Sequence, residues 1–87
     1  MHEIPPEAAL VEGIAAVCRE HLGHCGALTA DMPLVDTLAL DSVRMLTLVV
    51  ELENRYALTL EEGDEAELVT VGDLAALLAR RLGGAHG

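Results

Sequence analysis

The near-absence of aromatic side chains is the feature that most constrains how this chain can fold. Among the 87 residues only Tyr56 is aromatic, although 52% of the residues are hydrophobic. The core must therefore be built from Leu, Val, Ile, Met and Ala. Strands favour aromatic and β-branched residues, whereas helices accommodate Leu, Met and Ala well. We therefore expect an all-α fold, and the length indicates one domain, residues 1–87, with a modest core.

Apolar residues at helical spacing predict three main helices. The first covers residues 5–22, where Pro5 and Pro6 suit a helix start, and the second covers residues 42–56. The third follows Thr70 and ends at Gly83-Gly84. The expected buried positions are Leu10, Ile14, Val17, Cys18 and Leu22 in the first helix, and Leu74, Leu77, Leu78 and Leu82 in the third. We expect a small three-to-four-helix bundle whose core spans about residues 5–82, with residues 83–87 as a tail.

Side chains that cap helices support these boundaries. Asp41 precedes the second helix and can accept a hydrogen bond from a free backbone N–H of its first turn. Thr70 and Asp73 form a partial capping box at the start of the third helix. Residues 23–40 are predicted to form a long loop that packs its Leu residues on the core. Residues 57–69 include the acidic run EEGDEAE, where a short helical turn is expected.

The second helix has more apolar surface than one core face requires. On a helical wheel its core face is formed by Met45, Leu48, Val49, Leu52 and Tyr56. On the opposite side of the helix a solvent-exposed polar face is predicted, formed by Arg44, Thr47, Glu51, Asn54 and Arg55. Val43, Leu46 and Val50 remain as a second apolar strip. Either this helix is central and buried on most sides, or the Leu-rich loop covers it, or the strip is a docking surface for a partner, rimmed by Glu51 and Glu53.

Charge and composition exclude several classes of function. The formal net charge is −10, and the five basic residues are scattered Arg apart from Arg80-Arg81, which argues against binding to nucleic acid or to an anionic membrane. A basic protein partner is favoured instead. No export signal or membrane-length apolar run is visible, and two Cys make no disulfide framework, so we expect a cytoplasmic protein.

Metal binding is not predicted. The stretch CREHLGHC gathers Cys18, His21, His24 and Cys25, but its spacing differs from the usual zinc patterns and Cys18 falls on an apolar helix face. The acidic run near residues 61–67 lacks the alternating acids of a calcium loop. We interpret the first cluster as a buried Cys with surface His residues, and the second as a solvated loop.

The chain contains a single serine, Ser42, at the start of the second helix. A nucleophilic serine needs a base and oxyanion donors, and the surrounding LDSVR differs from the strained G-x-S-x-G turn of hydrolases. We therefore interpret Ser42 as a residue that another enzyme modifies. The positive end of a helix favours a phosphate attached there.

The stretch LALDSVRMLTLVVELENRY resembles the acyl carrier proteins, in which an Asp-Ser pair opens the second helix. The resemblance covers about residues 33–82 and includes the acidic loop and the Thr70-Val71 entry to the last helix. It implies that a phosphopantetheinyl transferase attaches 4′-phosphopantetheine from coenzyme A to Ser42, beside the cap Asp41. The arm then carries an acyl group as a thioester, and the protein itself catalyses nothing. Partner enzymes would dock on the second helix, through Val43, Arg44, Leu46, Thr47, Val50, Glu51 and Glu53.

The resemblance also suggests a class of pathway. Carriers of fatty-acid synthesis tend to have acids early in the second helix, where this chain has Arg44 and Thr47, and Ala39 replaces a usual glycine. We therefore expect a free-standing, monomeric carrier of polyketide-type biosynthesis, served by an acyltransferase, ketosynthase or other acyl-loading enzyme. The alternative is an aminoacyl or peptidyl carrier of nonribosomal peptide synthesis, loaded by an adenylating enzyme. A third possibility is a helical adaptor that carries nothing.

Overall fold

The computed structural model describes residues 4–61 and 68–83, and within them the fold is helical. Its elements, in chain order, are α1 (Glu7–Val17), the π-helical turn η1 (Cys18–Leu22), α2 (Leu34–Leu38), α3 (Ser42–Tyr56) and α4 (Val71–Gly83). The prediction of a small all-α bundle is confirmed. None of these helices has the length and hydropathy needed to cross a membrane.

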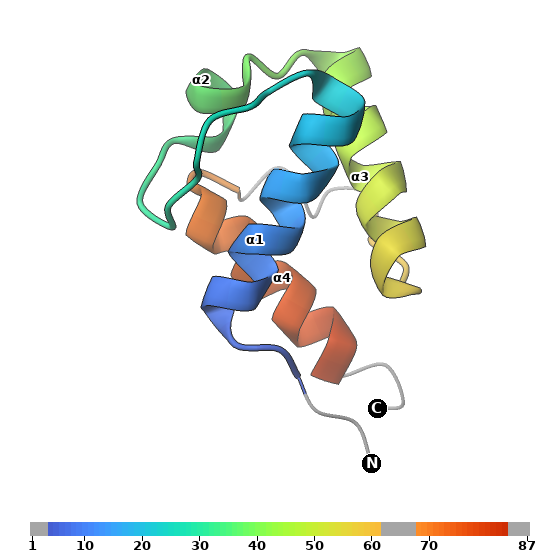
Figure 1. The fold of residues 1–87 in the computed structure, drawn as a ribbon. Helices are drawn as coiled ribbons and strands as arrows, with labels where there is room; N and C mark the ends of the chain where they lie inside the picture. The colour runs from blue at the N-terminus through green and yellow to red at the C-terminus, as the bar shows by residue number, and fades with distance from the viewer. Residues whose placement is uncertain (1–3, 62–67, 84–87) are drawn as a thin grey trace.

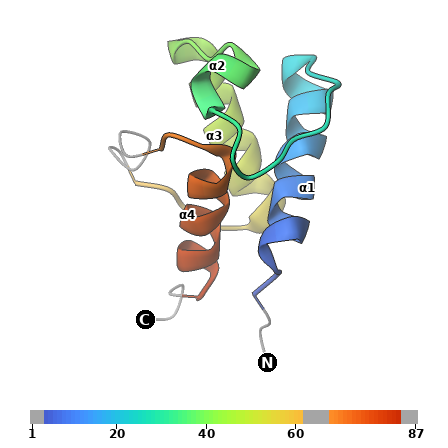
Figure 2. The same ribbon diagram turned by 90° about the vertical axis from the view of Figure 1, so that its left-hand side faces the viewer.

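Three long helices enclose the core, and the short α2 lies across one end of them (Figure 1). α1 packs against both α3 and α4, and η1 packs against α3. The view in Figure 2 shows α2 at the end of the bundle where α3 begins. The core between the helices is aliphatic, and its most deeply buried side chains include Leu10, Ile14, Leu34, Leu38, Leu48, Leu52, Leu74 and Leu78. The start of α3 is therefore held at a corner formed by several elements.

The first helical segment begins and ends close to its predicted limits. Pro6 has an extended backbone and caps α1, which starts at Glu7. The helix widens into η1, and Gly23 then adopts a left-handed conformation with φ of 71°. Glycine tolerates this conformation without a steric penalty, so it ends the helix there. The five apolar residues predicted for the buried face of this segment are all buried.

The prediction of a continuous loop over residues 23–40 was wrong in one respect, because α2 interrupts it. Its five residues are too short to show a helical period, so the sequence pattern did not reveal it. Leu34 and Leu38, one turn apart, are buried and anchor α2 on the core. Ala39 ends the helix in a left-handed conformation with φ of 52°. Tertiary burial, rather than local propensity, explains this element.

The segment before α2 is tied to the start of α4 by backbone hydrogen bonds. The N–H of Leu34 donates to the carbonyl of Val69 at 2.9 Å, and the N–H of Val71 donates to the carbonyl of Met32 at 2.9 Å. The predicted capping box of α4 is confirmed: the N–H of Asp73 donates to Thr70 Oγ1, and Asp73 Oδ2 accepts from the N–H of Thr70. The hydrogen bond that the Asp73 carboxylate accepts from the N–H of Thr70, and a further one from the N–H of Val69, lower the pKa of Asp73.

The connection between α3 and α4 is described only in part. Residues 58–61 are not helical, and the remainder of the predicted short turn, together with most of the acidic run, falls in residues 62–67, outside the described residues. Leu60 and Leu68, on either side of this gap, are half-buried and pack against the core. The path from α3 to α4 is therefore fastened to the bundle at both ends.

Candidate functional site

Ser42 is the first residue of α3 and is exposed to solvent. Asp41 caps the helix as predicted, because its Oδ1 accepts a hydrogen bond of 2.8 Å from the N–H of Arg44. The N–H of Met45 donates to the carbonyl of Asp41 at 2.8 Å and closes the first turn. The cap fixes the direction in which α3 begins, and it places the Ser42 hydroxyl at the positive end of a 15-residue helix.

The helical wheel predicted that Arg44 lies on a solvent-exposed side of α3, and the structure shows that this prediction was wrong. Its half-buried guanidinium donates to the carbonyl of Leu38 at 3.0 and 3.3 Å and to the carbonyl of Leu22 at 3.1 Å. These carbonyls belong to the last residues of α2 and η1, where a helix carries partial negative charge. Arg44 therefore joins three elements at the corner where Ser42 lies.

The predicted docking residues divide into two groups in the structure. Val43, Leu46 and Val50 are 72%, 63% and 40% exposed, and we call them the apolar strip. They occupy positions i, i+3 and i+7 and so share one face of α3, beginning beside Ser42. Neither the rest of the described bundle nor the Leu-rich loop covers them. The interpretation of α3 as a helix buried on most sides is therefore wrong.

The polar docking residues are instead turned toward other parts of the described chain. Glu51 Oε1 lies 3.3 Å from His21 Nε2 in η1. Glu53 Oε2 accepts a hydrogen bond of 2.8 Å from the N–H of Leu60. The hydroxyl of Thr47 donates to the carbonyl of Val43 one turn earlier. The side of α3 that bears Arg44 and Glu51 is partly buried, because η1 packs along it.

The core face of α3 matches the helical wheel. Leu48 and Leu52 are buried, and Met45, Val49 and Tyr56 are half-buried. Tyr56 lies over Gly13 of α1, and a Cβ added to Gly13 would overlap the Tyr56 hydroxyl. The only aromatic side chain of the protein therefore closes the contact between α1 and α3 at the end opposite Ser42.

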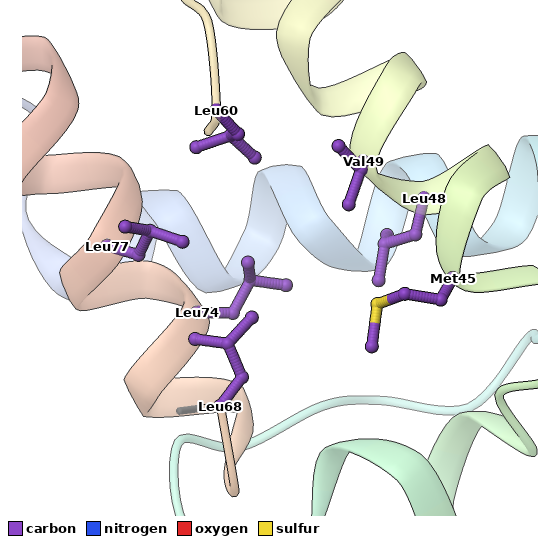
Figure 3. A pocket seen from close by; sticks show the side chains of 7 residues that line it. All are labelled: Met45, Leu48, Val49, Leu60, Leu68, Leu74 and Leu77. Atoms are coloured by element: carbon purple, nitrogen blue, oxygen red, sulfur yellow. The ribbon is translucent and has the colours of Figure 1, made fainter. Parts of the chain in front are cut away.

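A small apolar cavity lies between α3 and α4 (Figure 3). Its volume is about 10 Å³, roughly the space of one water molecule. The side chains that point toward it are Met45, Leu48 and Val49 from α3, Leu74 and Leu77 from α4, and Leu60 and Leu68 from the connecting segment. Among the described residues no polar side chain lines it, so the cavity suits hydrocarbon, although an acyl chain exceeds its present volume.

The Cys and His residues around η1 do not form a metal site in the structure. Cys18 is buried, Cys25 is exposed, and no group of three or more His, Cys, Asp or Glu side chains in residues 4–61 and 68–83 is placed to hold a metal ion. Burial raises the pKa of the Cys18 thiol to about 11, and the nearby charge of Arg44 opposes that shift. Cys18 is thus a neutral core residue beneath Arg44.

Sequence reasoning missed the tertiary roles of Arg44, His21 and Glu53. One signal was available for Arg44: a long side chain in the first turn of a helix points back toward the helix N-terminus, and so toward the chain that enters the helix. The acceptors at Leu22, Leu38 and Leu60 could not be identified, because backbone carbonyls and amides carry no sequence signature. The serine, its cap and the apolar strip were recognisable because they are local to one helix.

Comparisons with known proteins agree with this geometry. The family model described as "Phosphopantetheine attachment site" matches residues 10–78, a range that contains all of α3. The acyl carrier protein of Exiguobacterium sp. is 32% identical over 76 residues, which cover 87% of this chain and 96% of that protein. The acyl carrier protein of Kineococcus radiotolerans is 31% identical over 78 residues, which cover 88% of this chain and 96% of that protein. The meromycolate extension acyl carrier protein of Mycobacterium tuberculosis is 32% identical over 72 residues, which cover 82% of this chain and 63% of that protein.

Proposed function

Because the chain belongs to the acyl carrier protein family, we propose that Ser42 is the residue to which its phosphopantetheine is attached. The cofactor of this family is 4′-phosphopantetheine, derived from coenzyme A. When bound, this group supplies a thiol on a flexible arm, and the thiol holds an acyl group as a thioester. The observation that carries the assignment is the exposed hydroxyl of the chain's single serine at the Asp41-capped start of α3.

The residues around Ser42 fit such a group. A phosphodiester at this position is negatively charged, and the first turn of a helix presents backbone N–H groups that lack intrahelical partners. Asp41 accepts from the N–H of Arg44, and the N–H groups at the tip of the helix are those of the exposed residues Ser42 and Val43. The Arg44 guanidinium is engaged with the carbonyls of Leu22 and Leu38, so the fit rests on the helix end rather than on a cation.

The chain's own residues serve to present the modified serine. Asp41 fixes the start of α3, Arg44 holds α2 and η1 against it, and the exposed position of Ser42 leaves it accessible to a phosphopantetheinyl transferase. In this proposal the protein is a substrate for its partners and not itself an enzyme. The partners are the transferase and the enzymes that load or process the acyl group, such as an acyltransferase or ketosynthase.

For the pathway, the proposal is an acyl carrier of polyketide-type biosynthesis. It is supported by the lack of acidic side chains among the exposed residues of α3, which departs from the acid-rich second helix of fatty-acid carriers. The modified protein would be offered malonyl-CoA with a polyketide-type acyltransferase and, in parallel, amino acids and ATP with a peptide-type adenylating enzyme. Transfer of malonate supports the proposal, and exclusive aminoacyl loading would replace it with the aminoacyl-carrier alternative.

The attachment site itself is tested by intact-protein mass. Wild type and Ser42→Ala are incubated with a broad-specificity transferase, coenzyme A and Mg²⁺, and both are checked for helical circular dichroism. We expect wild type alone to gain the mass of one phosphopantetheinyl group. A folded wild type that gains nothing would refute the carrier function and leave the helical adaptor as the better description. A gain that persists in Ser42→Ala would place the attachment elsewhere.

A further inference from the structure

A groove large enough for a ligand runs along α1, on the side that faces residues 25–30. It consists of two adjoining cavities of about 300 and 320 Å³, which share the lining residues Val11, Glu12 and Leu28. Ligand pockets in proteins typically begin at about 300 Å³. Figure 2 shows that the segment after η1 descends beside α1 before it crosses to α2. We call this hollow the α1 groove.

The α1 groove lies on the side of α1 that is turned away from α3. Ala8, Val11 and Ala15 line it and occupy positions i, i+3 and i+7, so they share one face of the helix. Gly13, which meets Tyr56 of α3, points about 170° away from that face on a helical wheel. A molecule bound in the groove would therefore leave the start of α3 uncovered.

The lining of the groove carries charges that have no partner in the described chain. Val11 and Leu28 are 8% and 9% exposed and give the groove an apolar floor. Glu12 lines both cavities, Glu7 lines one of them, and Arg19 lines the other. All three charged residues are exposed, and none of them forms a salt bridge within residues 4–61 and 68–83. Their charges are therefore free to bind groups of another molecule.

The backbone of the facing segment also lacks partners. Residues 25–28 lie outside the helices, and their backbone groups make no hydrogen bond with another described residue. Cys25, Gly26 and Ala27 are exposed, so the N–H and C=O groups here are open to solvent. An exposed backbone of this kind can pair with an extended peptide, as an open strand edge does. The segment thus offers main-chain hydrogen bonds beside a hollow that has room for side chains.

We propose that the α1 groove binds an extended peptide segment of a partner protein. A basic side chain of that segment faces Glu7 and Glu12, an acidic one faces Arg19, and an apolar one packs on the floor formed by Val11 and Leu28. The groove follows the helix from Glu7 to Arg19, a length of about 18 Å, which matches roughly five residues of extended chain.

Charge favours this occupant over other macromolecules. With a net charge of −10, a second copy of the chain would be repelled, as would an anionic membrane. The same charge attracts a basic peptide segment from a distance. The inference goes beyond the proposed function, because a segment held in the groove and an enzyme acting on Ser42 can bind at the same time. The groove would tether the carrier to a partner while the serine remains accessible.

The test uses the full chain, with random peptides about five residues long, displayed on phage, as the probe. Selected peptides are synthesised, and their dissociation constants are measured by fluorescence anisotropy for wild type, Ala8→Phe and Ala76→Phe. Both alanines are exposed on a helix, but only Ala8 lines the groove, so Ala76→Phe is the matched control. We expect Ala8→Phe to weaken binding about tenfold or more, and the control to stay within about twofold of wild type.

Two further changes examine the chemistry of binding. Glu12→Lys should weaken peptides that carry Lys or Arg about tenfold, and it keeps the test decisive if circular dichroism shows that Ala8→Phe does not fold. Methylation of the peptide's backbone nitrogens should also weaken binding, because it removes the main-chain donors. A phosphopantetheinyl transferase should modify Ser42 in Ala8→Phe at the wild-type rate, since the groove is a separate surface.

The outcomes separate this inference from the proposed function. Selected peptides that bind folded Ala8→Phe and Glu12→Lys as tightly as wild type would overturn the inference, and so would a selection that enriches no peptide. A wild-type dimer in sedimentation that Ala8→Phe dissociates would assign the groove to a second copy instead. If the expected binding pattern is found but Ser42 of wild type is never modified, the proposed function fails and the peptide groove stands.

Discussion

Replacing Arg44 by Met removes the guanidinium that joins α3 to η1 and α2 while keeping an unbranched side-chain stem in place. The Asp41 cap uses the backbone N–H of residue 44, so the substitution leaves the cap intact. Two carbonyls, those of Leu22 and Leu38, lose a charged donor. A hydrogen bond to a charged group contributes roughly 1.5–3 kcal/mol, so two carbonyls would account for about 3–6 kcal/mol in a fully buried site. Partial solvent access at this half-buried site reduces the expected loss to about 2–3 kcal/mol.

Two assays follow this loss. The melting temperature should fall by about 10 °C or more, since a domain of this size shifts by roughly 4–8 °C per kcal/mol. In a Cys25→Ser background the buried Cys18 becomes the single thiol, and its labelling reports opening of the corner that Arg44 closes. A loss of about 2 kcal/mol raises the population of open states roughly 30-fold, so labelling should accelerate by a similar factor.

The matched control is Arg55→Met, on the exposed end of the same helix. It removes one cation–π contact and should cost less than about 1 kcal/mol. If Arg44→Met melts within about 2 °C of wild type and Cys18 is labelled no faster, the hydrogen bonds of Arg44 do not hold the corner together. The reasoning from its contacts would then be refuted.

Two further predictions concern the core. Gly13→Ala should lower the free energy of unfolding by about 1–2 kcal/mol, because the new Cβ displaces Tyr56 and this cost outweighs the better helix propensity of Ala. Chemical denaturation measures this free energy. An equal or higher stability would contradict the packing of Tyr56 on α1. The free energy of unfolding should also fall between about pH 9 and 11, by at most roughly 2–3 kcal/mol, because the Cys18 pKa is raised from an ordinary value of 9.0 to about 11. Below this pH range the thiol keeps its proton in both the folded and the unfolded protein. Within the range the unfolded protein loses the proton first. Cys18→Ala should flatten this part of the pH profile, and an unchanged slope would exclude Cys18 as its cause.

Much of the fold follows from local pattern. The periodic Leu residues of α1 and α4, the Asp41 cap and the Thr70–Asp73 capping box were all recognisable, because each depends on residues within one turn or one helix face. The short α2 was not recognisable. Its five residues carry too few apolar positions to define a period, and its stability comes from burying Leu34 and Leu38 against residues distant in sequence.

The candidate site divides in the same way. Sequence alone determined the single serine, its place at a helix start, and the presence of a second apolar strip on that helix, since all three are properties of consecutive residues. Only the tertiary structure decided which charges remain free. On a helical wheel Arg44, Glu51 and Glu53 cannot be told apart from exposed polar residues. In the structure Arg44 donates to a carbonyl in η1, Glu51 faces a His in η1, and Glu53 accepts from a backbone amide after α3. Such partners meet only when the chain is folded. They could not be identified beforehand, because nothing in the sequence marks a backbone group as the acceptor or donor for a side chain far away.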